Sequence, residues 1–433
     1  MLLKNSIKLS TVCRLDCNRW LSQCVSLEEI ADQIYSDSPK ESRFTKQLQV
    51  NGQIYYYERG CQLVYPYFNI SQAYCLGDWV GKYICEVYFK NRVKPPKKVM
   101  NGLIEKGFIR VNKEKVSPDY VMKPSDVLSH VFHFHENPII DLPFKTVHLD
   151  DEFLVIDKPP GIPMHSAGKY KYNSLITMAK NKYGSIYGFN RIDSVTSGLI
   201  VLVRNQAKAS ELSNQMANRK ISKEYICEVR GNFPHDEIKV DVPLARCFGI
   251  SGPVIVDKHS GLPSVTLFKK IKFDHKKGTS IISCSPLTGR THQIRVHLQY
   301  LGFPIFNDFT YNSTAFGQNC GKNGDYGGLS DRQIYHLAYI EDAKRIAELR
   351  EESVDCINEY DYLLQDYRND EWVDYTHENC YKPELDSYCP ECYTCCLAYK
   401  EPPIISKQFL HLHALRYKGA DWEFATQLPY WAR

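Results

Sequence analysis

Residues 188–204 read GFNRIDSVTSGLIVLVR, and the second half of this stretch predicts a buried strand. Leu199–Val203 is an unbroken run of apolar and β-branched residues, the pattern of a strand covered on both faces. The first half places Arg191 and Asp193 two residues apart, just before a Thr-Ser-Gly turn. An aspartate held rigidly on such a turn can act as a nucleophile or base, and the alternative is that it only forms the turn.

The sequence on either side of this stretch favours an α+β fold with a mixed sheet. Strand-like runs dominate from about residue 145 to residue 310, and helical stretches interrupt them at 206–220 and within 279–302. Segments 409–419 and 422–431 predict a hairpin that returns to the same sheet. Strands with helices segregated from them are typical of the α+β class.

A smaller basic segment precedes this region, between about residue 60 and residue 140. Apolar residues at helical spacing follow Pro95 and Pro96, and Gly107 ends the predicted helix before a short strand in FIRVN. Two interpretations stay open for its cations, a phosphate-binding surface or a solvated helix face. These cations are Lys97, Lys98, Lys106, Arg110, Lys113 and Lys115.

Charge is divided unevenly along the chain. Residues 341–391 hold 16 Asp and Glu against 5 Lys and Arg, a net charge of −11. The formal net charge of the whole chain is +4, so the rest carries 49 basic and 34 acidic residues, a net of +15. A basic body of this kind favours a polyanionic partner, and the alternative is charge spread over an ordinary surface. The acidic block is typical of a solvated excursion.

Length and cysteine usage bound the class of protein. The 433 residues are enough for one large or two to three ordinary domains, and the apolar runs are too short to cross a bilayer. The 16 cysteines are scattered and no secretory pattern is seen, which favours a reducing, intracellular compartment, the cytoplasm or the nucleus. Residues 1–24 hold four basic residues and one acidic residue, which is also compatible with a mitochondrial transit peptide.

Cysteines and histidines invite a metal interpretation in two places. Cys389 and Cys392 have the spacing of one edge of a tetrahedral zinc site, and free thiols are the alternative that we favour. His411 and His413 lie two apart on a predicted strand without an acidic ligand at metal-binding spacing, so we expect packing and hydrogen-bonding roles. The side chains that could complete the zinc site are Cys380, Cys395 and His377.

Five sequence blocks occur between about Val147 and Trp431. In order they read FLVIDKPPGIPMH, RIDSVTSGL, ISKEY, LTGRTHQIRVHLQYLGFPIFND and LHAL. Together they resemble the RluA-type pseudouridine synthases. The resemblance implies an isomerase that converts uridine already in an RNA chain to pseudouridine, on a fold whose central sheet is mixed and largely antiparallel. It implies no cofactor and no metal, because no electrons or groups are gained or lost.

The resemblance also implies roles for single residues. Asp193 matches the essential catalytic carboxylate of the family, which acts at the ribose of a nucleotide flipped out of its stack. Tyr225 matches a tyrosine that stacks on the target base and can take part in proton transfer. Arg295 matches an arginine that pairs with the carboxylate and keeps it charged and oriented. Arg191 matches the arginine that fills the vacated stack. The residues expected to contact RNA are Arg191, Arg290, His292, Lys97, Lys98 and Arg110.

Resemblance extends to the amino-terminal part of the chain. Residues 98–116 are similar to the S4-like RNA-binding domain that many of these enzymes carry. Residues 129–140 resemble the bridging segment of the eukaryotic branch that modifies tRNA in the anticodon stem-loop region. We therefore expect a monomer that acts on tRNA, with mRNA and rRNA as alternatives. The expected domains are a leader at 1–45, an S4-like module with its bridge at 46–142, and a catalytic domain at 143–433 with an acidic insertion at about 312–406.

Two residues depart from the family pattern. Two other functions are alternatives to the pseudouridine synthase. Asn190 stands where the family usually has histidine, and Ile192 stands where it has leucine, a change of shape at nearly constant volume. Asparagine can still form hydrogen bonds but cannot carry a proton charge. The competing functions are a catalytically inactive RNA-binding protein of the same fold and a zinc-organised interaction protein. Retention of Asp193, Tyr225 and Arg295 together favours the enzyme.

Overall fold

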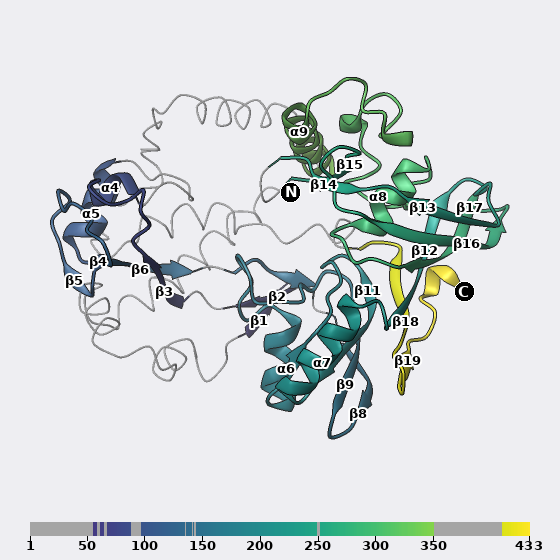
Figure 1. Ribbon diagram of the computed structural model, residues 1–433, viewed down its shortest axis with the longest axis horizontal. Coiled ribbons are helices and arrows are strands. Elements are labelled where there is room, and N and C mark those ends of the chain that lie inside the picture. Colours follow the sequence, from purple (N-terminus) through teal and green to yellow (C-terminus); the bar gives the residue numbers. More distant parts are fainter. Residues whose placement is uncertain are drawn as a thin grey trace, which may run out of the picture. The chain divides into compact units, whose positions relative to one another are not determined.

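The computed structural model describes residues 55–58, 61–64, 67–87, 97–134, 136–140, 142, 144–248, 252–349 and 409–433 (Figure 1). These residues fall into two compact units, a smaller one mainly within 63–137 and a larger one built mainly from 138–349 and 409–433. Within the described residues, every helix is too short or too polar to span a bilayer. The predicted leader at 1–45 and the zinc candidates Cys380, Cys389, Cys392 and Cys395, with His377, lie outside the described residues.

The smaller unit packs an amphipathic helix against a four-stranded antiparallel sheet. Its elements are β1 (Tyr55–Glu58), β3 (Tyr67–Tyr74), α4 (Ile84–Val87), α5 (Lys97–Glu105), β4 (Ile109–Val111), β5 (Glu114–Lys115) and β6 (Val127–Phe134). The sheet order is β3-β6-β4-β5, and each pairing is antiparallel. From α5, Met100, Leu103 and Ile104 are buried in one apolar cluster with residues of β4 and β6, because they share one face of the helix. The predicted helix and the strand after it are confirmed.

Arg110 departs from its expected position on a solvent-exposed surface. It lies in β4 with only 7% of its surface exposed. Its Nε donates to the carbonyl oxygen of Gly107 at 2.9 Å, and its Nη1 to that of Lys113 at 3.5 Å. All three residues of the strand are buried, and the guanidinium holds the turns on either side of it. Arg110 is therefore not part of the exposed basic surface of this unit.

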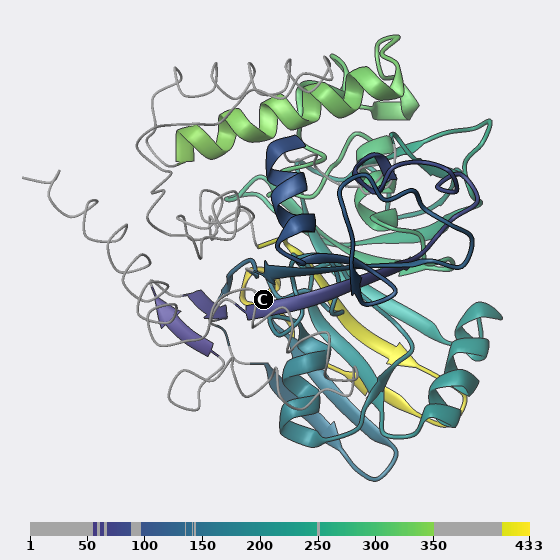
Figure 2. The same cartoon turned by 90° about the vertical axis from the view of Figure 1, so that its left-hand side faces the viewer.

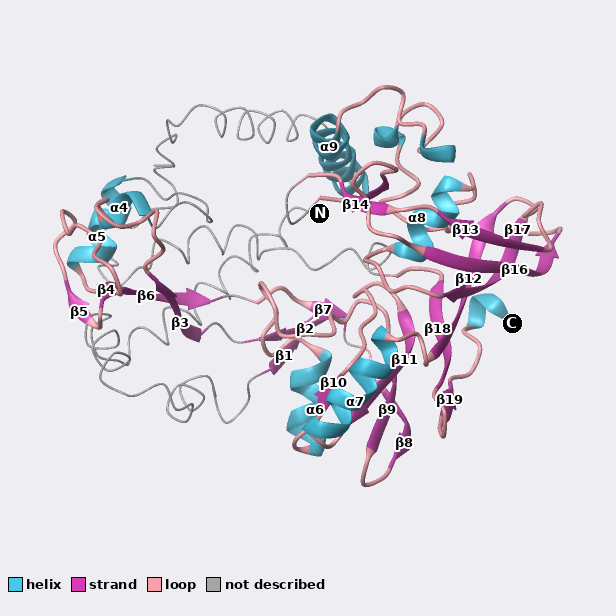
Figure 3. Ribbon diagram, in the orientation of Figure 1, coloured by secondary structure: helices cyan, strands magenta, loops and turns pink. Residues whose placement is uncertain are grey.

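The larger unit is built on a ten-stranded mixed sheet (Figures 1 and 3). Its strands are β8 (Lys145–Leu149), β9 (Phe153–Lys158), β10 (Tyr187–Gly188), β11 (Ser197–Val203), β12 (Ser222–Arg230), β13 (Glu237–Asp241), β16 (Val265–Asp274), β17 (Thr279–Pro286), β18 (Leu412–Lys418) and β19 (Glu423–Ala425). The main order is β13-β16-β17-β12-β18-β11-β9-β8, with β10 on β11 and β19 on β18. Only the pairing of β11 with β18 is parallel among those of this sheet.

The centre of the sheet is assembled from distant parts of the chain. Figure 2 shows β18, in yellow, among the teal strands of the larger unit. Gly198–Val203 of β11 is entirely buried, as the apolar run predicts. The predicted hairpin at the end of the sequence is also confirmed, since β19 pairs antiparallel with β18. The α+β class with a mixed, largely antiparallel sheet is therefore correct.

Helices and short elements complete the larger unit. They are β2 (Cys61–Val64), which pairs with β7 (Ile139–Ile140), α6 (Leu175–Tyr183), α7 (Gln206–Ala217), β14 (Leu244–Arg246), which pairs with β15 (Val254–Val256), α8 (Gln293–Tyr300), η1 (Thr314–Phe316), η2 (Lys322–Gly324), α9 (Asp331–Leu349) and η4 (Tyr430–Ala432). Helices α6 and α7 bury Leu175, Ala179, Ala209 and Leu212 in the same core as β9 and β11. Helix α9 begins ten residues before the acidic block that starts at residue 341, and it continues into that block.

Helix α8 is buried on all sides, which fixes the side chains that it presents to the site. Ile294 and Leu298, four residues apart, pack into the main core, whereas Val296 packs with β14 and β15. All residues from Gln293 to Gln299 are buried. Arg295 projects from this helix with its rotation about the helix axis set by packing on two sides.

Candidate active site

The loop that carries Asp193 leads directly into β11. Gly198, near the start of the strand, has a φ of 107° and lies opposite Ala414 of β18 in the parallel register. A side chain at residue 198 would overlap backbone atoms of Ala414. Glycine is therefore required for β18 to approach the end of the loop this closely.

A buried lysine holds the backbone beside Asp193. Lys158, the last residue of β9, is fully buried, and its Nζ donates to the carbonyl oxygens of Pro159, Ile162 and Ser194 at 2.8, 2.9 and 2.9 Å. Three acceptors match the three donors of an ammonium group. Burial lowers the pKa of Lys158 to about 7, while nearby carboxylates, Asp193 first among them, act in the opposite direction. Lys158 thus ties the turn after β9 to the residue that follows Asp193.

Asp193 faces two basic side chains that come from the start of α8. Its side chain is 20% exposed, and its Oδ2 lies 3.5 Å from Nη1 of Arg295 and 3.7 Å from Nε2 of His292. The structure therefore brings Asp193, Arg295 and His292 together, although the aspartate lies about a hundred residues before the other two. Both basic side chains contact the same carboxylate oxygen, Oδ2.

The strongest partner of Arg295 is Asp308, a residue to which the sequence analysis gave no role. Nε and Nη2 of Arg295 donate to the two carboxylate oxygens of Asp308 at 2.6 and 2.8 Å, and the Asp308 side chain is fully buried. Such a bidentate pair fixes the plane of the guanidinium. Burial acts to raise the pKa of Asp308, but the charge of Arg295 outweighs it and holds that pKa below its usual value. Asp308 therefore aims the remaining nitrogen, Nη1, at Asp193.

His292 is a neutral neighbour of the carboxylate at neutral pH. It caps α8 with a φ of 53°, in the left-handed region, and its Nδ1 lies 2.9 Å from the hydroxyl of Tyr311. Burial, and then the charge of Arg295, lower the pKa of His292 to about 4. The ring can exchange hydrogen bonds with a ligand, but it adds no positive charge to the site.

Tyr225 lies on β12, and its hydroxyl is paired inside the protein. The hydroxyl oxygens of Tyr225 and Tyr417 are 2.6 Å apart, and both side chains are buried. Burial, followed by the neighbouring Tyr417, raises the pKa of Tyr225 well above 10, so the phenol stays protonated. Burial raises the pKa of Tyr417 to about 12, against an opposing influence of the Tyr225 hydroxyl and the Asn190 amide.

Asn190 lies beside this tyrosine pair. Both polar atoms of its amide are buried, and within the described residues neither makes a hydrogen bond of ordinary geometry. The amide is nevertheless near enough to Tyr417 to lower that residue's pKa. Asp193, in turn, contacts Arg295 and His292 rather than Asn190. The departure from the family pattern therefore concerns the tyrosine pair and not the immediate partners of the carboxylate.

A cavity of about 160 Å³ opens beside Asp193. Its lining comes from three segments: the loop before β11, the α8 region with the Asn307–Thr310 turn, and the backbone just before β18. An apolar cavity of roughly this size holds a benzene molecule, so the space suits one ring-sized group rather than a whole nucleotide. The lining residues are Asp193, Ser194, Val195, His292, Arg295, Asn307, Asp308, Phe309, Thr310, Phe409 and Leu410.

The other predicted RNA contacts are spread more widely. Arg191 is exposed, two residues from Asp193. Arg290 is also exposed, and its Nε donates to the carbonyl oxygen of Pro263 at 3.3 Å, so it lies near α8 without lining the cavity. Lys97 and Lys98 begin α5 in the smaller unit. Sequence reasoning missed Lys158, Asp308 and Tyr417, which lie inside or close to the five sequence blocks. Each carries a polar side chain at a position expected in the core, and that was the available signal.

The two carboxy-terminal histidines have the packing and hydrogen-bonding roles that were predicted. His411 Nδ1 lies 2.6 Å from Glu228 Oε2, and its ring stacks on Trp431. His413 bridges the Ser197 hydroxyl at 2.9 Å and the Thr426 hydroxyl at 2.7 Å. Among the described residues, no cluster of His, Cys, Asp and Glu has the geometry to hold a metal ion.

The mixed sheet, the carboxylate on its loop and the arginine held beside it are the features that the resemblance in sequence implies. They agree with the class of protein that the resemblance implies, an isomerase that modifies RNA.

Comparisons with known proteins identify the family. The family model described as RNA pseudouridylate synthase matches residues 152–300. The chain is 30% identical over 409 residues to pseudouridylate synthase RPUSD2 of Mus musculus, covering 88% of this chain and 73% of that protein. It is 30% identical over 421 residues to tRNA pseudouridine(31) synthase of Saccharomyces cerevisiae, covering 87% and 97%. Identity to the mitochondrial tRNA pseudouridine(32) synthase of the same yeast is 36% over 264 residues, covering 60% and 57%.

The chain therefore belongs to the RNA pseudouridylate synthase family, and it is an isomerase that converts uridine to pseudouridine in RNA.

Proposed function

We propose that this enzyme modifies uridine in tRNA, in the anticodon stem-loop region, and that Asp193 is its catalytic carboxylate. The catalytic role of Asp193 is supported by the orientation of Arg295. Asp308 fixes the Arg295 guanidinium, and the Nη1 atom of that guanidinium faces Asp193 beside a ring-sized cavity. Two relatives support the first part, because their names specify tRNA and the positions 31 and 32. The resemblance of residues 129–140 to the bridging segment of tRNA-modifying enzymes agrees with this choice.

The reaction requires that a bond from the ribose to nitrogen breaks and a bond to carbon forms. The target nucleotide must leave its stack, because the glycosidic bond is shielded inside stacked RNA. Asp193 then acts at the ribose, either by attacking the anomeric carbon or by assisting an elimination. Arg295 pairs with the carboxylate and orients it throughout. The exposed Arg191 occupies the space that the nucleotide has left.

Tyr225 acts on the uracil ring as a protonated phenol. Its pKa lies well above 10, so the hydroxyl can donate a hydrogen bond but is not deprotonated and does not serve as a general base. Tyr417 holds that hydroxyl at 2.6 Å and thereby limits its orientation. In this proposal Tyr225 contacts the detached base while it turns, and Tyr417 positions Tyr225.

The test uses purified enzyme and total RNA that lacks pseudouridine. We expect new pseudouridine in tRNA with the wild type, and a rate at least about a hundredfold lower for Asp193→Asn, the usual scale for loss of a catalytic acid or base. Asp421→Asn removes an exposed carboxylate on the turn between β18 and β19 and serves as the matched control. Full activity of Asp193→Asn would overturn the catalytic assignment. Modification confined to rRNA or mRNA would overturn the choice of tRNA.

We further propose that the smaller unit is the S4-like module that grips RNA through α5. Charge reversal at the start of that helix, Lys97→Glu with Lys98→Glu, should weaken binding to all RNAs to a similar extent, because phosphate contacts carry no sequence information. The slope of log affinity against log salt should fall by about one for each phosphate that these side chains no longer neutralise. Unchanged affinity and slope would remove this unit from the binding surface.

A further inference from the structure

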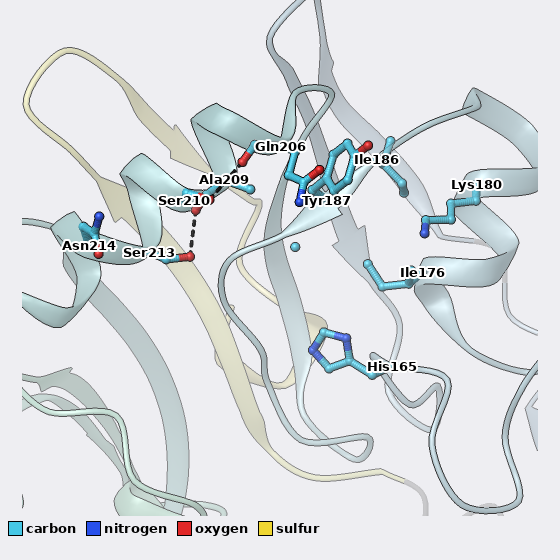
Figure 4. Close-up of a pocket in the computed structure, with 11 residues that line it drawn as sticks. His165, Ile176, Lys180, Ile186, Tyr187, Gln206, Ala209, Ser210, Ser213 and Asn214 are labelled. Atoms are coloured by element: carbon cyan, nitrogen blue, oxygen red, sulfur yellow. Dashed lines mark hydrogen bonds between the residues drawn. The ribbon is translucent and has the colours of Figure 1, made fainter. Parts of the chain in front are cut away.

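A second and larger cavity lies between α6 and α7 (Figure 4). Its volume is about 530 Å³, and it shares no lining residue with the cavity beside Asp193. The short strand β10 contributes Tyr187 and Gly188, and the loop before α6 contributes His165. The reaction at Asp193 assigns no role to this cavity.

The cavity presents polar groups that the protein itself leaves unpaired. Within the described residues, the side-chain nitrogen and oxygen atoms of Lys180, Tyr187, Gln206 and Asn214 enter no hydrogen bond or ion pair. Figure 4 shows Lys180, Gln206, Tyr187 and the His165 ring around the same hollow. A cation, a phenol and two amides are therefore free to bind a polar ligand.

The serines on the α7 side of the cavity keep acceptor capacity. The hydroxyls of Ser210 and Ser213 donate to the helix carbonyl oxygens of Gln206 and Ala209 at 3.2 and 2.7 Å, which Figure 4 marks with dashed lines. Because each hydroxyl donates its single hydrogen to a helix carbonyl oxygen, it can offer a ligand only its lone pairs as acceptors. This side of the cavity suits the amino or imino donors of a base.

Among the described residues that line the cavity, Lys180 is the one Lys or Arg and none is Asp or Glu, so the lining favours an anionic ligand. Between His165 and Arg191 the chain contains five Lys and Arg and no Asp or Glu, with tyrosines interleaved among them. Glu211 of α7 does not line the cavity, and Lys208 pairs with it at 3.5 Å. Basic residues alternating with aromatic rings are typical of surfaces that hold a nucleic-acid strand by its phosphates and bases.

The cavity is joined to the proposed catalytic loop through the backbone. From Gly188, at the end of β10, five residues lead to Asp193, a span of at most about 18 Å. This is the length of about five stacked nucleotides. His165 is also close to Arg191, since burial and then the charge of Arg191 lower the pKa of His165. An RNA chain at Asp193 therefore has this cavity within reach.

We propose that the cavity between α6 and α7 binds a second nucleotide of the same RNA substrate, a few positions from the target uridine. Lys180 and His165 contact its phosphate, and Tyr187, Gln206 and Asn214 contact its base. The site would bind the RNA in register, so that the target nucleotide is delivered to Asp193. This inference rests on the RNA substrate of the enzyme and not on the catalytic role of Asp193.

The test measures RNA affinity at several salt concentrations together with kcat and KM on modification-free tRNA. Lys180→Ala should reduce the salt slope by about one, whereas Lys180→Arg should retain it. Ser210→Trp fills the cavity and should raise KM roughly tenfold with little change in kcat, the scale of losing one stacked base. Two variants serve as controls outside the cavity, Ala217→Trp on the same helix and Lys276→Ala on the β16–β17 turn, and both should match the wild type.

Two results would overturn the proposal. One is an unchanged salt slope in Lys180→Ala together with a KM of Ser210→Trp within twofold of the wild type. The other comes from a competition experiment with uridine monophosphate. If this nucleotide protects Lys180 from acylation but leaves RNA affinity unchanged, the cavity binds a free nucleotide and not the RNA substrate. Thermal melting checks that each variant is folded. Because RNA binding is read directly, failure of the Asp193 assignment would leave this test intact.

Discussion

Arg295 contacts two carboxylates at different distances, and the difference separates their roles. Asp308 receives two bonds at 2.6 and 2.8 Å, whereas Asp193 lies at 3.5 Å. The short pair fixes the position of the guanidinium. The longer contact leaves Asp193 loosely held, so that its oxygens can move toward a ribose while they remain within the field of the cation.

Replacing Asp308 with asparagine should therefore impair both stability and activity. Asp308→Asn leaves the buried Arg295 without its counter-charge, a loss of about 3–5 kcal/mol in the free energy of unfolding. The rate should fall as well, because Nη1 is no longer aimed at Asp193. Urea unfolding and initial rates measure the two effects, and Asp325→Asn, at an exposed turn, is the control. Wild-type activity in a folded Asp308→Asn protein would contradict the positioning role.

Tyr417 should act through Tyr225 alone. Tyr417→Phe keeps the buried ring and removes the hydroxyl 2.6 Å from that of Tyr225. An unpaired buried hydroxyl costs about 1–3 kcal/mol. We expect kcat to fall roughly tenfold with KM unchanged, since about 1.4 kcal/mol of barrier corresponds to that factor.

A double-mutant cycle separates this role from a purely structural one. If Tyr417 works by orienting Tyr225, then Tyr417→Phe should add almost nothing to the effect of Tyr225→Phe on kcat. Additive losses in kcat would show that Tyr417 acts independently of Tyr225.

At the scale of elements, the local pattern predicted most of the strands and helices. The apolar run in β11, the apolar periodicity of α5 and the hairpin of β18 and β19 each follow from residues close together in sequence. The parallel pairing of β11 with β18 does not, because it joins segments about 215 residues apart. The burial of Arg110 and of Lys158 was also missed. The apolar run before Lys158 indicates a buried position, but it does not show which carbonyl groups will accept hydrogen bonds from the cation.

The turn after β9 and the loop that carries Asp193 are both held by Lys158. Lys158→Met keeps an unbranched side chain of similar length but removes the donors to three carbonyl oxygens. We expect a loss of about 1–3 kcal/mol in the free energy of unfolding and a lower rate, because Ser194 no longer has its brace. Lys269→Met, at an exposed position of β16, should change neither. A Lys158→Met protein with wild-type stability would contradict this account of the turn.

At the scale of the whole larger unit, buried histidines make the fold sensitive to acid. Burial lowers the pKa of His292, His297 and His413 to about 4 each, from 6.5. Between these values the unfolded chain binds protons that the folded chain does not, so stability is present at pH 7 and falls as the pH drops through 6.5 toward 4. Each of these histidines lowers the free energy of unfolding by up to about 1.4 kcal/mol for each pH unit within this range.

Urea unfolding at pH 7 and pH 5 measures this dependence. His413→Gln keeps a polar side chain between Ser197 and Thr426. It should reduce the difference in the free energy of unfolding between pH 7 and pH 5 by up to the contribution of one histidine. His275→Gln, at an exposed turn, should leave the difference unchanged. Equal stability of the wild type at both pH values would show that these histidines are not held neutral.

The parallel contact of β11 with β18 also has a consequence for biosynthesis. Ser197, at the end of the loop that carries Asp193, bonds to His413, which the ribosome adds 216 residues later. Contacts of such long sequence separation form late, because the intervening chain must first be ordered. The sheet beside Asp193 is therefore incomplete until β18 has been translated, so we expect a chain that stops before β18 to lack the strand that supports the Asp193 loop.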